Sequence, residues 1–439
     1  MAQVFPFCGL RYNEKKIKDI KTVLAPPYDV VNKEARDKFL LESKYNIFHL
    51  ELPKEDKKNN RNRYENAAHF LNKWKREGII IRDESPRIYS YEIDFKIDNK
   101  NFSRKAIVAL VRVEPWENRI IRPHEKTFDK VTTDRLHLLE HTKTQFSQVF
   151  LLYRGNQQAT EILNEYNSNM LYEVVDSLGN THRLSSISDL DCAKRLHEFF
   201  SSLPMYIADG HHRYTTALNF SKMMQAKFGA ESWRAYNYIM VYMVDIDDPG
   251  LIVLPTHRIV TLSNYDEILG VLKNSKDFFE ITKKKPFISI ESLREIRIEL
   301  EKLKESTAFA VFYKDNNKIF SEIWKLKEHI LTELMRLIPR SLAELDVTIL
   351  NEIVFSKVIK LDIERESDIS RVSFTPEDVD VLKIEKNQMF FMLNATDAHK
   401  VLKVSDEGLV MPHKSTFFYP KILTGLVMNS VSEHDKILL

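Results

Sequence analysis

The order of apolar and polar residues along the chain predicts a mixture of strands and helices. Over 64–77 the apolar residues Ala67, Phe70, Leu71 and Trp74 recur at helical spacing. Alternating or continuous apolar runs predict strands at 87–95, 103–113, 149–153, 171–175, 181–184, 205–208, 236–244, 251–254, 308–313, 389–394 and 417–419. Further helices are predicted at 157–166, 189–202, 211–228, 265–274, 292–304, 348–361 and 397–403. The pattern indicates an α/β fold of mixed α+β character.

The texture of the chain changes three times, which predicts four regions. A mixed α/β region spans 1–150, and an α/β core spans 151–262. A peripheral helical or α+β subdomain rich in lysine and glutamate spans 263–345, and an αβ region returns over 346–439. A chain of 439 residues is too long for one ordinary hydrophobic core.

Composition narrows the class of partner. The 65 Lys and Arg residues nearly balance the 63 Asp and Glu residues, giving a formal charge of +2, which argues against a general nucleic-acid or membrane-surface binder. Cys8 and Cys192 form no metal-binding spacing and no disulfide framework. We therefore expect a cytoplasmic protein that uses small-molecule substrates and has no nucleic-acid or membrane partner. The oligomeric state is open.

The most informative stretch is Asp209-Gly210-His211-His212-Arg213. An apolar strand enters a turn at Gly210, and a helix follows. Glycine lets the backbone approach a ligand, and the helix N-terminus presents N–H groups and the positive end of its dipole. This arrangement predicts an anion site, most naturally for phosphate. The alternative is that Asp209 only caps the helix and the histidines are solvated.

A second cluster, Arg122-Pro123-His124-Glu125-Lys126-Thr127, is poor core material because each charge needs a partner. The functional interpretation makes Glu125 or His124 a general base and Lys126 or Arg135 a phosphate partner. Asp134-Arg135 begins a helix-like run. An exposed loop with incidental charges is the alternative.

Two later segments add cationic and hydroxyl groups. Thr256-His257-Arg258 follows a strand, and Lys414-Ser415-Thr416 follows a proline without the glycines of a P-loop. Surface positions at a strand end are an equally good interpretation of the first segment. The common nucleotide, dinucleotide, zinc-protease and serine-hydrolase motifs do not occur in the sequence.

The stretch 209–214 resembles the phosphate loop of the ParB/sulfiredoxin superfamily, including its free serine kinase branch. From 25 to 421 the chain resembles a bacterial-type family known as a domain of unknown function. The matching segments are Ala25–Val30, His124–Thr127, Asp134–Arg135, Ile207–Ala217, Leu254–Arg258 and Met411–Lys421. The superfamily resemblance implies a ParB/sulfiredoxin-like core. Gly210 stands where sulfiredoxin carries its catalytic cysteine, which excludes sulfiredoxin chemistry.

The family resemblance implies a pyrophosphate-dependent L-serine kinase that makes O-phospho-L-serine for cysteine synthesis. In the mechanism that we expect, Glu125 accepts the serine proton, with His124 in reserve, and Mg²⁺ bridges the phosphates through Asp209 and solvent. His211 acts on the transferring phosphoryl group. The phosphate-binding set is Gly210, His211, His212, Arg213, Lys126, Lys414, Ser415 and Thr416. The substrate-binding set is Tyr28, Asp29, Arg135, His257 and Arg258.

Two other functions fit the same residues. One is a ParB-like nucleotide-binding hydrolase or regulatory switch, and the other is a sensor of phosphoserine or phosphate. The sequence also leaves the donor open among pyrophosphate, ADP, ATP and CTP, together with the acceptor, the direction of flux and the convergence of the motifs in space.

Overall fold

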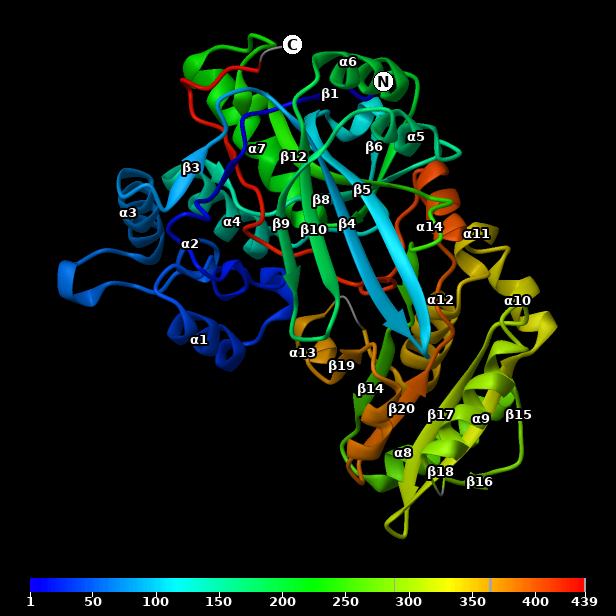
Figure 1. Ribbon diagram of the computed structural model, residues 1–439. Helices are drawn as coiled ribbons and strands as arrows, with labels where there is room; N and C mark the ends of the chain where they lie inside the picture. Colours follow the sequence, from blue (N-terminus) through cyan, green and yellow to red (C-terminus); the bar gives the residue numbers. More distant parts are fainter. Residues whose placement is uncertain (288, 363–364, 438–439) are drawn as a thin grey trace. The chain divides into compact units, whose positions relative to one another are not determined.

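The computed structural model describes residues 1–287, 289–362 and 365–437 (Figure 1). Contacts divide the chain into two compact units. Unit 1 comprises Met1–Ile252 and Pro420–Leu439, and unit 2 comprises Val253–Tyr419. Unit 2 is therefore inserted in the sequence of unit 1, which resumes after it.

Unit 1 is built on a nine-stranded mixed sheet in the order β6-β11-β8-β12-β5-β4-β10-β9, with β1 paired to β5. Its strands are β1 (Val4–Phe5), β4 (Ile88–Ile97), β5 (Lys100–Arg112), β6 (Ile121–Arg122), β8 (Val149–Tyr153), β9 (Asn169–Val175), β10 (Thr181–Ile187), β11 (Met205–Asp209) and β12 (Tyr238–Asp245). β12 is parallel to β8, whereas β11 is antiparallel to β8. Two small pairs accompany the sheet, β2 (Leu10–Tyr12) with β3 (Ile80–Arg82) and β7 (Thr144–Gln145) with β22 (Asn429–Ser430).

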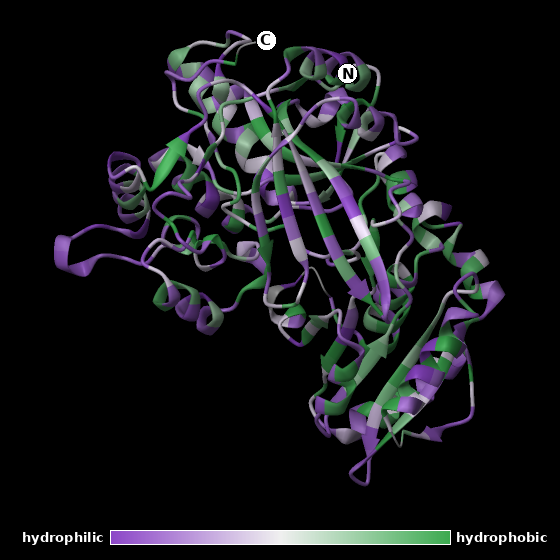
Figure 2. Cartoon of the chain, in the orientation of Figure 1, coloured by the Kyte–Doolittle hydropathy of each residue, from purple (hydrophilic) through white to green (hydrophobic). Residues whose placement is uncertain are grey.

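The burial of these strands follows their composition. All eight residues of β12 and all five of β8 are buried, as continuous apolar runs at the centre of a sheet require. β4 alternates instead, and it turns into β5 through Asp98 and Asn99, both at positive φ, which confirms the predicted hairpin. Figure 2 shows hydrophobic residues along the central strands and a hydrophilic tip on this hairpin.

The helices of unit 1 are α1 (Lys33–Glu42), α2 (Phe48–Glu51), α3 (Arg63–Arg76), α4 (Asp129–Thr142), α5 (Gln158–Asn164), α6 (Leu190–Phe200) and α7 (His211–Phe228). Apolar residues of α5, α6 and α7, such as Leu163, Leu196 and Ala217, share one core with β8, β11 and β12. α4 begins at Asp129, five residues before the expected start at Asp134, so Arg135 lies inside the helix. No helix in the described part of the chain is long and apolar enough to cross a membrane.

Unit 2 contains a seven-stranded sheet in the order β15-β18-β17-β20-β14-β19, with β16 on β18. Its strands are β14 (His257–Thr261), β15 (Phe279–Ile281), β16 (Lys285–Pro286), β17 (Ala308–Asp315), β18 (Lys318–Leu326), β19 (Val372–Thr375) and β20 (Gln388–Met392). A separate pair joins β13 (Ile252–Leu254) to β21 (Phe417–Tyr419). The helices are α8 (Tyr265–Asn274), α9 (Ile290–Glu301), α10 (Glu328–Leu334), α11 (Arg340–Ala343), α12 (Asp346–Ile349), α13 (Glu366–Ile369) and α14 (Ala398–Asp406).

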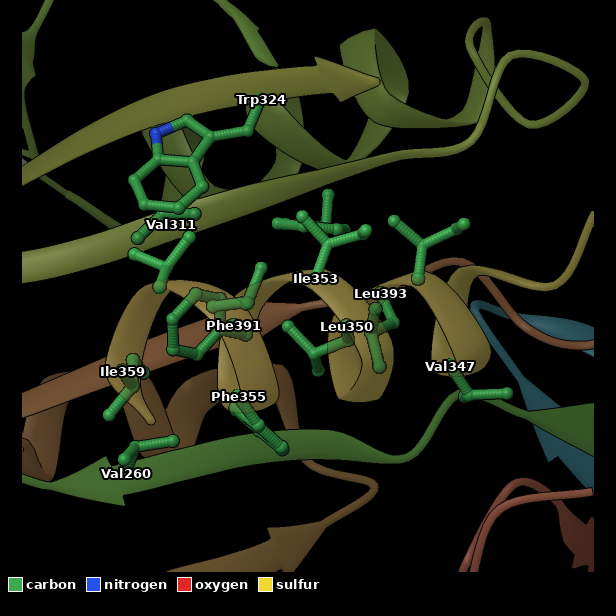
Figure 3. Close-up of a cluster of buried hydrophobic side chains, with 14 of the residues drawn as sticks. Val260, Val311, Trp324, Val347, Leu350, Ile353, Phe355, Ile359, Phe391 and Leu393 are labelled. Carbon is green, nitrogen blue, oxygen red and sulfur yellow. The ribbon is translucent and has the colours of Figure 1, made fainter. Parts of the chain in front are cut away.

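The core of unit 2 forms around a helix that changes its winding. α12 continues into a π-helix over Leu350–Ile359, where the sequence predicted one ordinary helix over 348–361. Phe355 and Ile353 of this segment pack with Trp324 of β18 and Phe391 of β20 in one buried cluster (Figure 3).

The two units differ from the four regions expected from sequence. The hairpin β17–β18 lies in the segment 263–345, yet β17 pairs with β20, which in turn pairs with β14. Strands from three of the expected regions therefore share one sheet, because sheet pairing joins segments that are distant in the chain. The α/β class is shown: helices accompany a mixed sheet in unit 1 and an antiparallel sheet in unit 2.

Candidate functional site

The predicted strand-to-helix junction is present in unit 1. β11 ends at Asp209, and α7 begins at His211. Gly210 between them has φ 93° and ψ 31°, a left-handed conformation that disfavours other residues. A Cβ atom at Gly210 would lie 2.9 Å from Nε of Arg213. This position therefore needs glycine both for its backbone and for its close approach to an arginine.

Asp209 is the partner of two cations. Nη2 of Arg213 donates to its Oδ2 at 2.6 Å, and Nζ of Lys421 donates to its Oδ1 at 2.9 Å. Arg213 is buried and also donates to the carbonyl oxygen of Gln148. Because both carboxylate oxygens accept from cations, Asp209 is poorly placed to bind Mg²⁺ directly, and its metal role stays a prediction.

His124 and His211 meet beside this junction. The two rings stand edge to face with centroids 4.6 Å apart, and Nε2 of His211 accepts the backbone N–H of His124 at 3.2 Å. The side chains are 1% and 5% exposed. Glu125 is only partly buried, and one ligand atom from each of His124, Glu125 and His211 lies within 4.8 Å of the others.

Both histidines are neutral at physiological pH. Burial, followed by the neighbouring His124, lowers the pKa of His211 to about 3. Burial also lowers the pKa of His124, although a hydrogen bond to the backbone of Ile207 opposes the shift. His211 therefore carries no positive charge with which to neutralise a phosphate.

The loop before α4 is fastened to the first turn of α7. The backbone N–H of Phe128 donates to Nε2 of His212 at 3.0 Å, and the two rings stack at 5.9 Å. Together with the bond from His124, this places Glu125 and the exposed Lys126 beside the N-terminus of α7. The predicted segments His124–Thr127 and Asp209–Arg213 therefore converge.

Residues of the predicted segment Ala25–Val30 lie near Arg213. The charges of Asp29 and Glu51 raise the pKa of Arg213, and the guanidinium of Arg135 lies over the ring of Tyr28, 4.6 Å from its centroid. Arg135 also donates to Asp134 and to the backbone oxygen of Glu51. The structure thus brings the predicted Tyr28, Asp29 and Arg135 to the neighbourhood of Arg213.

Glu51 is a buried acid that no sequence motif predicted. Its Oε1 accepts from Oγ of Ser147 at 2.8 Å, and burial raises the pKa of the carboxyl group. Glu51, Arg135 and Arg213 line a cavity of about 60 Å³ with Ser147. Only the fold could reveal Glu51, because its sequence neighbours carry no motif.

The remaining predicted residues belong to unit 2. His257 is buried, and its ring contacts Asp378 and the backbone N–H of Leu393. Arg258 is buried too, and it donates to the backbone oxygens of Thr256, His413 and Lys414. Burial lowers the pKa of Arg258 to about 9. Its substrate role stays a prediction, since the contacts show it holding the loop of Lys414.

That loop has its own internal bonds. Oγ of Ser415 donates to the backbone oxygen of Pro412, and Oγ1 of Thr396 donates to the backbone oxygen of Ser415. Lys414 has φ 56°, which is unusual for a residue with a side chain. Thr416 is partly buried. The phosphate-binding roles of Lys414, Ser415 and Thr416 stay predictions.

Lys421 is the main residue of this site that the sequence did not predict. It ends the segment Met411–Lys421 on which the family resemblance rested, so a signal for it existed in the sequence. The ion pair with Asp209 joins residues 212 positions apart, and no local pattern predicts such a contact.

Three comparisons place the chain among known proteins. Solved structures similar to it include a free serine kinase variant in complex with ADP (13% identity, TM-score 0.34, covering 73% of this chain and 92% of that one). Others are SbnI with a C-terminal truncation from Staphylococcus aureus (9%, 0.36, 72% and 85%) and a conserved hypothetical protein from Pyrococcus furiosus (14%, 0.33, 73% and 95%). Among curated proteins none matches. Residues 4–348 match the family described as "Protein of unknown function (DUF1015)", and the chain belongs to this family.

Proposed function

We propose that the protein is a phosphotransferase that moves a phosphoryl group from pyrophosphate to the hydroxyl of free L-serine. The observation that carries the proposal is the convergence of three distant motifs on the N-terminus of α7. Tyr28 and Asp29, the loop of His124 and Glu125, and the turn at Gly210 all lie around Arg213 or His211. Phosphoryl transfer needs such a site, because its catalysis consists mainly of positioning and electrostatic stabilisation.

The phosphate half of the proposed site is the first turn of α7. Gly210 offers no side-chain cap, so the N–H groups of the first turn face the end of the helix. Arg213 and Lys421 carry two positive charges against one negative charge on Asp209, which leaves a net charge of +1 (2 − 1). Helix dipole and cations together favour an anion at this end.

The acceptor half is the group of Tyr28, Asp29 and Arg135. Asp29 is exposed and suits the ammonium group of an amino acid, whereas the arginines suit its carboxylate. The serine oxygen attacks the nearer phosphorus, the bridging P–O bond breaks, and orthophosphate leaves. Glu125 takes the hydroxyl proton. His124 is the reserve candidate for the base, and burial lowers the pKa of its ring.

Mg²⁺ enters this proposal with the donor. Magnesium favours oxygen ligands and retains water, and the oxygens of pyrophosphate supply such ligands. The carboxylate of Asp209 does not fit a direct bond to the ion, because Arg213 and Lys421 occupy both of its oxygens. We therefore treat magnesium pyrophosphate as the substrate.

The test is ³¹P NMR of the purified protein with L-serine, Mg²⁺ and, in parallel, pyrophosphate, ADP, ATP or CTP. A phosphoserine signal with pyrophosphate alone is the expected result. L-alanine, which lacks the hydroxyl group, is the matched control acceptor. If orthophosphate forms equally fast with alanine, the protein is a hydrolase and not a kinase. If pyrophosphate binds saturably but no product forms, the protein is a phosphate sensor.

A further inference from the structure

The cluster of His124, Glu125 and His211 has a role that the proposed mechanism does not use. Two nearly inaccessible imidazoles and one partly buried carboxylate bring their ligand atoms within 4.8 Å of one another. They come from two elements, the loop after β6 and the first turn of α7, and the bond from the His124 N–H to His211 holds these elements together. A divalent ion at the centre could reach all three groups.

His124 is oriented as a metal-binding histidine is. One ring nitrogen donates to the backbone carbonyl of Ile207, so in the neutral ring the other nitrogen carries the lone pair. Histidine ligands are normally fixed in this way, by a hydrogen bond from the ring nitrogen that does not hold the metal. This second observation is independent of the proximity of the three side chains.

His211 contacts the backbone of His124 in a way that metal binding would change. Its Nε2 accepts the His124 N–H at 3.2 Å, near the long end of hydrogen-bond distances. A metal on Nε2 would replace that bond, so the backbone amide of His124 reports on occupancy.

The donor set selects the kind of ion. Two imidazole nitrogens and one carboxylate suit Zn²⁺, Mn²⁺, Fe²⁺ or Co²⁺ and leave positions open for oxygen ligands. Mg²⁺ prefers oxygen ligands throughout. We propose that His124, Glu125 and His211 bind a divalent transition-metal ion whose open positions face the N-terminus of α7. The site is therefore distinct from the magnesium that accompanies pyrophosphate.

The consequence for catalysis rests on the proposed function, whereas the binding itself does not. An ion in this place would accept a phosphate oxygen and supply the positive charge that the neutral histidines lack. A carboxylate that binds through one oxygen keeps the other for the serine proton, so Glu125 can serve both tasks.

The experiment uses Co²⁺, which absorbs visible light when bound. Protein stripped with EDTA is titrated with Co²⁺ in excess Mg²⁺, and the bound ion is counted by equilibrium dialysis. We expect one Co²⁺ per chain, visible ligand-field bands and a shifted His124 amide signal in NMR. Affinity should fall by about 100-fold or more in His124→Asn, His211→Asn and Glu125→Gln, in line with the sensitivity of metal sites to their surroundings. His212→Ala, one position along α7, is the matched control and should retain the ion.

Three results would overturn the inference: no Co²⁺ bound by the intact protein, equal displacement by Mg²⁺, or undiminished binding in the folded Glu125→Gln variant. Circular dichroism verifies that each variant folds, and Glu125→Gln changes a partly exposed group by a single atom. Co²⁺ binding without phosphoserine formation would support the metal site and contradict the proposed kinase function. Phosphoserine formation without Co²⁺ binding would support the kinase function and contradict the metal site.

Discussion

Unit 1 and unit 2 each bury histidine beside a carboxylate, but the surroundings differ. In unit 2, Nε2 of His257 lies 2.6 Å from Oδ1 of Asp378, and its Nδ1 accepts the N–H of Leu393 at 3.1 Å. Both ring nitrogens are thereby bound to the protein. In unit 1, the rings of His124 and His211 face each other with Glu125 alongside. The two histidine environments therefore differ in the partners of the rings rather than in burial.

The two units also differ in how they treat a buried arginine. Arg213 has a carboxylate partner, and Asp209 raises its pKa. Arg258 has no acidic partner among the described residues, and burial lowers its pKa to about 9. Its hydrogen bonds go to backbone oxygens instead. The buried arginine of unit 1 is thus part of an ion pair, whereas that of unit 2 holds a loop through backbone oxygens.

The largest effect expected from this comparison is on activity. Glu125→Gln should lower phosphoserine formation by about 10²-fold to 10⁴-fold, the usual contribution of a general base. The free energy of unfolding should change little, since the side chain is partly exposed. Initial rates from ³¹P NMR and denaturant unfolding measure the two quantities. A variant with full activity would remove Glu125 from the chemistry.

In unit 2 we expect the opposite signature, a loss of stability. Asp378→Asn weakens the contacts of both His257 and Arg297, and it should lower the free energy of unfolding by about 2–3 kcal/mol. Glu344→Gln, which breaks the exposed pair with Arg340, is the control and should cost about 1 kcal/mol or less. Equal losses in the two variants would mean that the His257 cluster is not special.

The pH dependence of stability sharpens the contrast for His211. In metal-free protein the folded state takes up a proton only near pH 3, whereas the unfolded state does so near pH 6.5. The contribution of His211 is therefore complete above pH 6.5 and is lost as the pH falls toward 3, at up to about 1.4 kcal/mol per pH unit. The charges of His124, Glu125, Asp209 and His212 also act on the ring. Chemical denaturation at several pH values should give a shallower slope for His211→Asn, and an unchanged slope would contradict the shift.

The smallest effect concerns the turn itself. Gly210→Ala and Gly179→Ala both place a side chain at positive φ, 93° and 85°, but only the first meets another atom. The left-handed conformation costs each about 1–2 kcal/mol. Gly210→Ala should lose about 1 kcal/mol more, since Arg213 must move, and should weaken pyrophosphate binding measured by calorimetry. Equal losses of unfolding free energy in the two variants would show that the Arg213 side chain moves aside at no cost.

Local patterns predicted much of this molecule. β8, α8 and β21 have the bounds that the apolar pattern predicted, and the turn at Gly210 lies where the sequence placed it. α1 and β18 were not predicted. α1 has no buried residue, although its Phe39 packs edge to face on Phe48, and β18 alternates only partly. Elements that are only weakly buried show little apolar periodicity in the sequence.

The site was harder to predict because its energetics depend on contacts between distant residues. The motif residues were visible, but the neutrality of His211 follows from burial against His124, 87 positions away. The pairing of Asp209 with Lys421 and of His257 with Asp378 likewise joins segments far apart in the chain. The residue types indicated the chemistry, but only the fold determines which of these side chains are charged and which charges are paired.

The insertion of unit 2 imposes an order on biosynthesis. Asp209 leaves the ribosome well before Lys421, which is 212 residues later. At ordinary rates of translation this interval lasts about 10–40 s. During that time Asp209 lacks one of its two cationic partners, and β7 lacks its partner β22. The nascent chain therefore cannot complete the site of unit 1 until all of unit 2 has been synthesised.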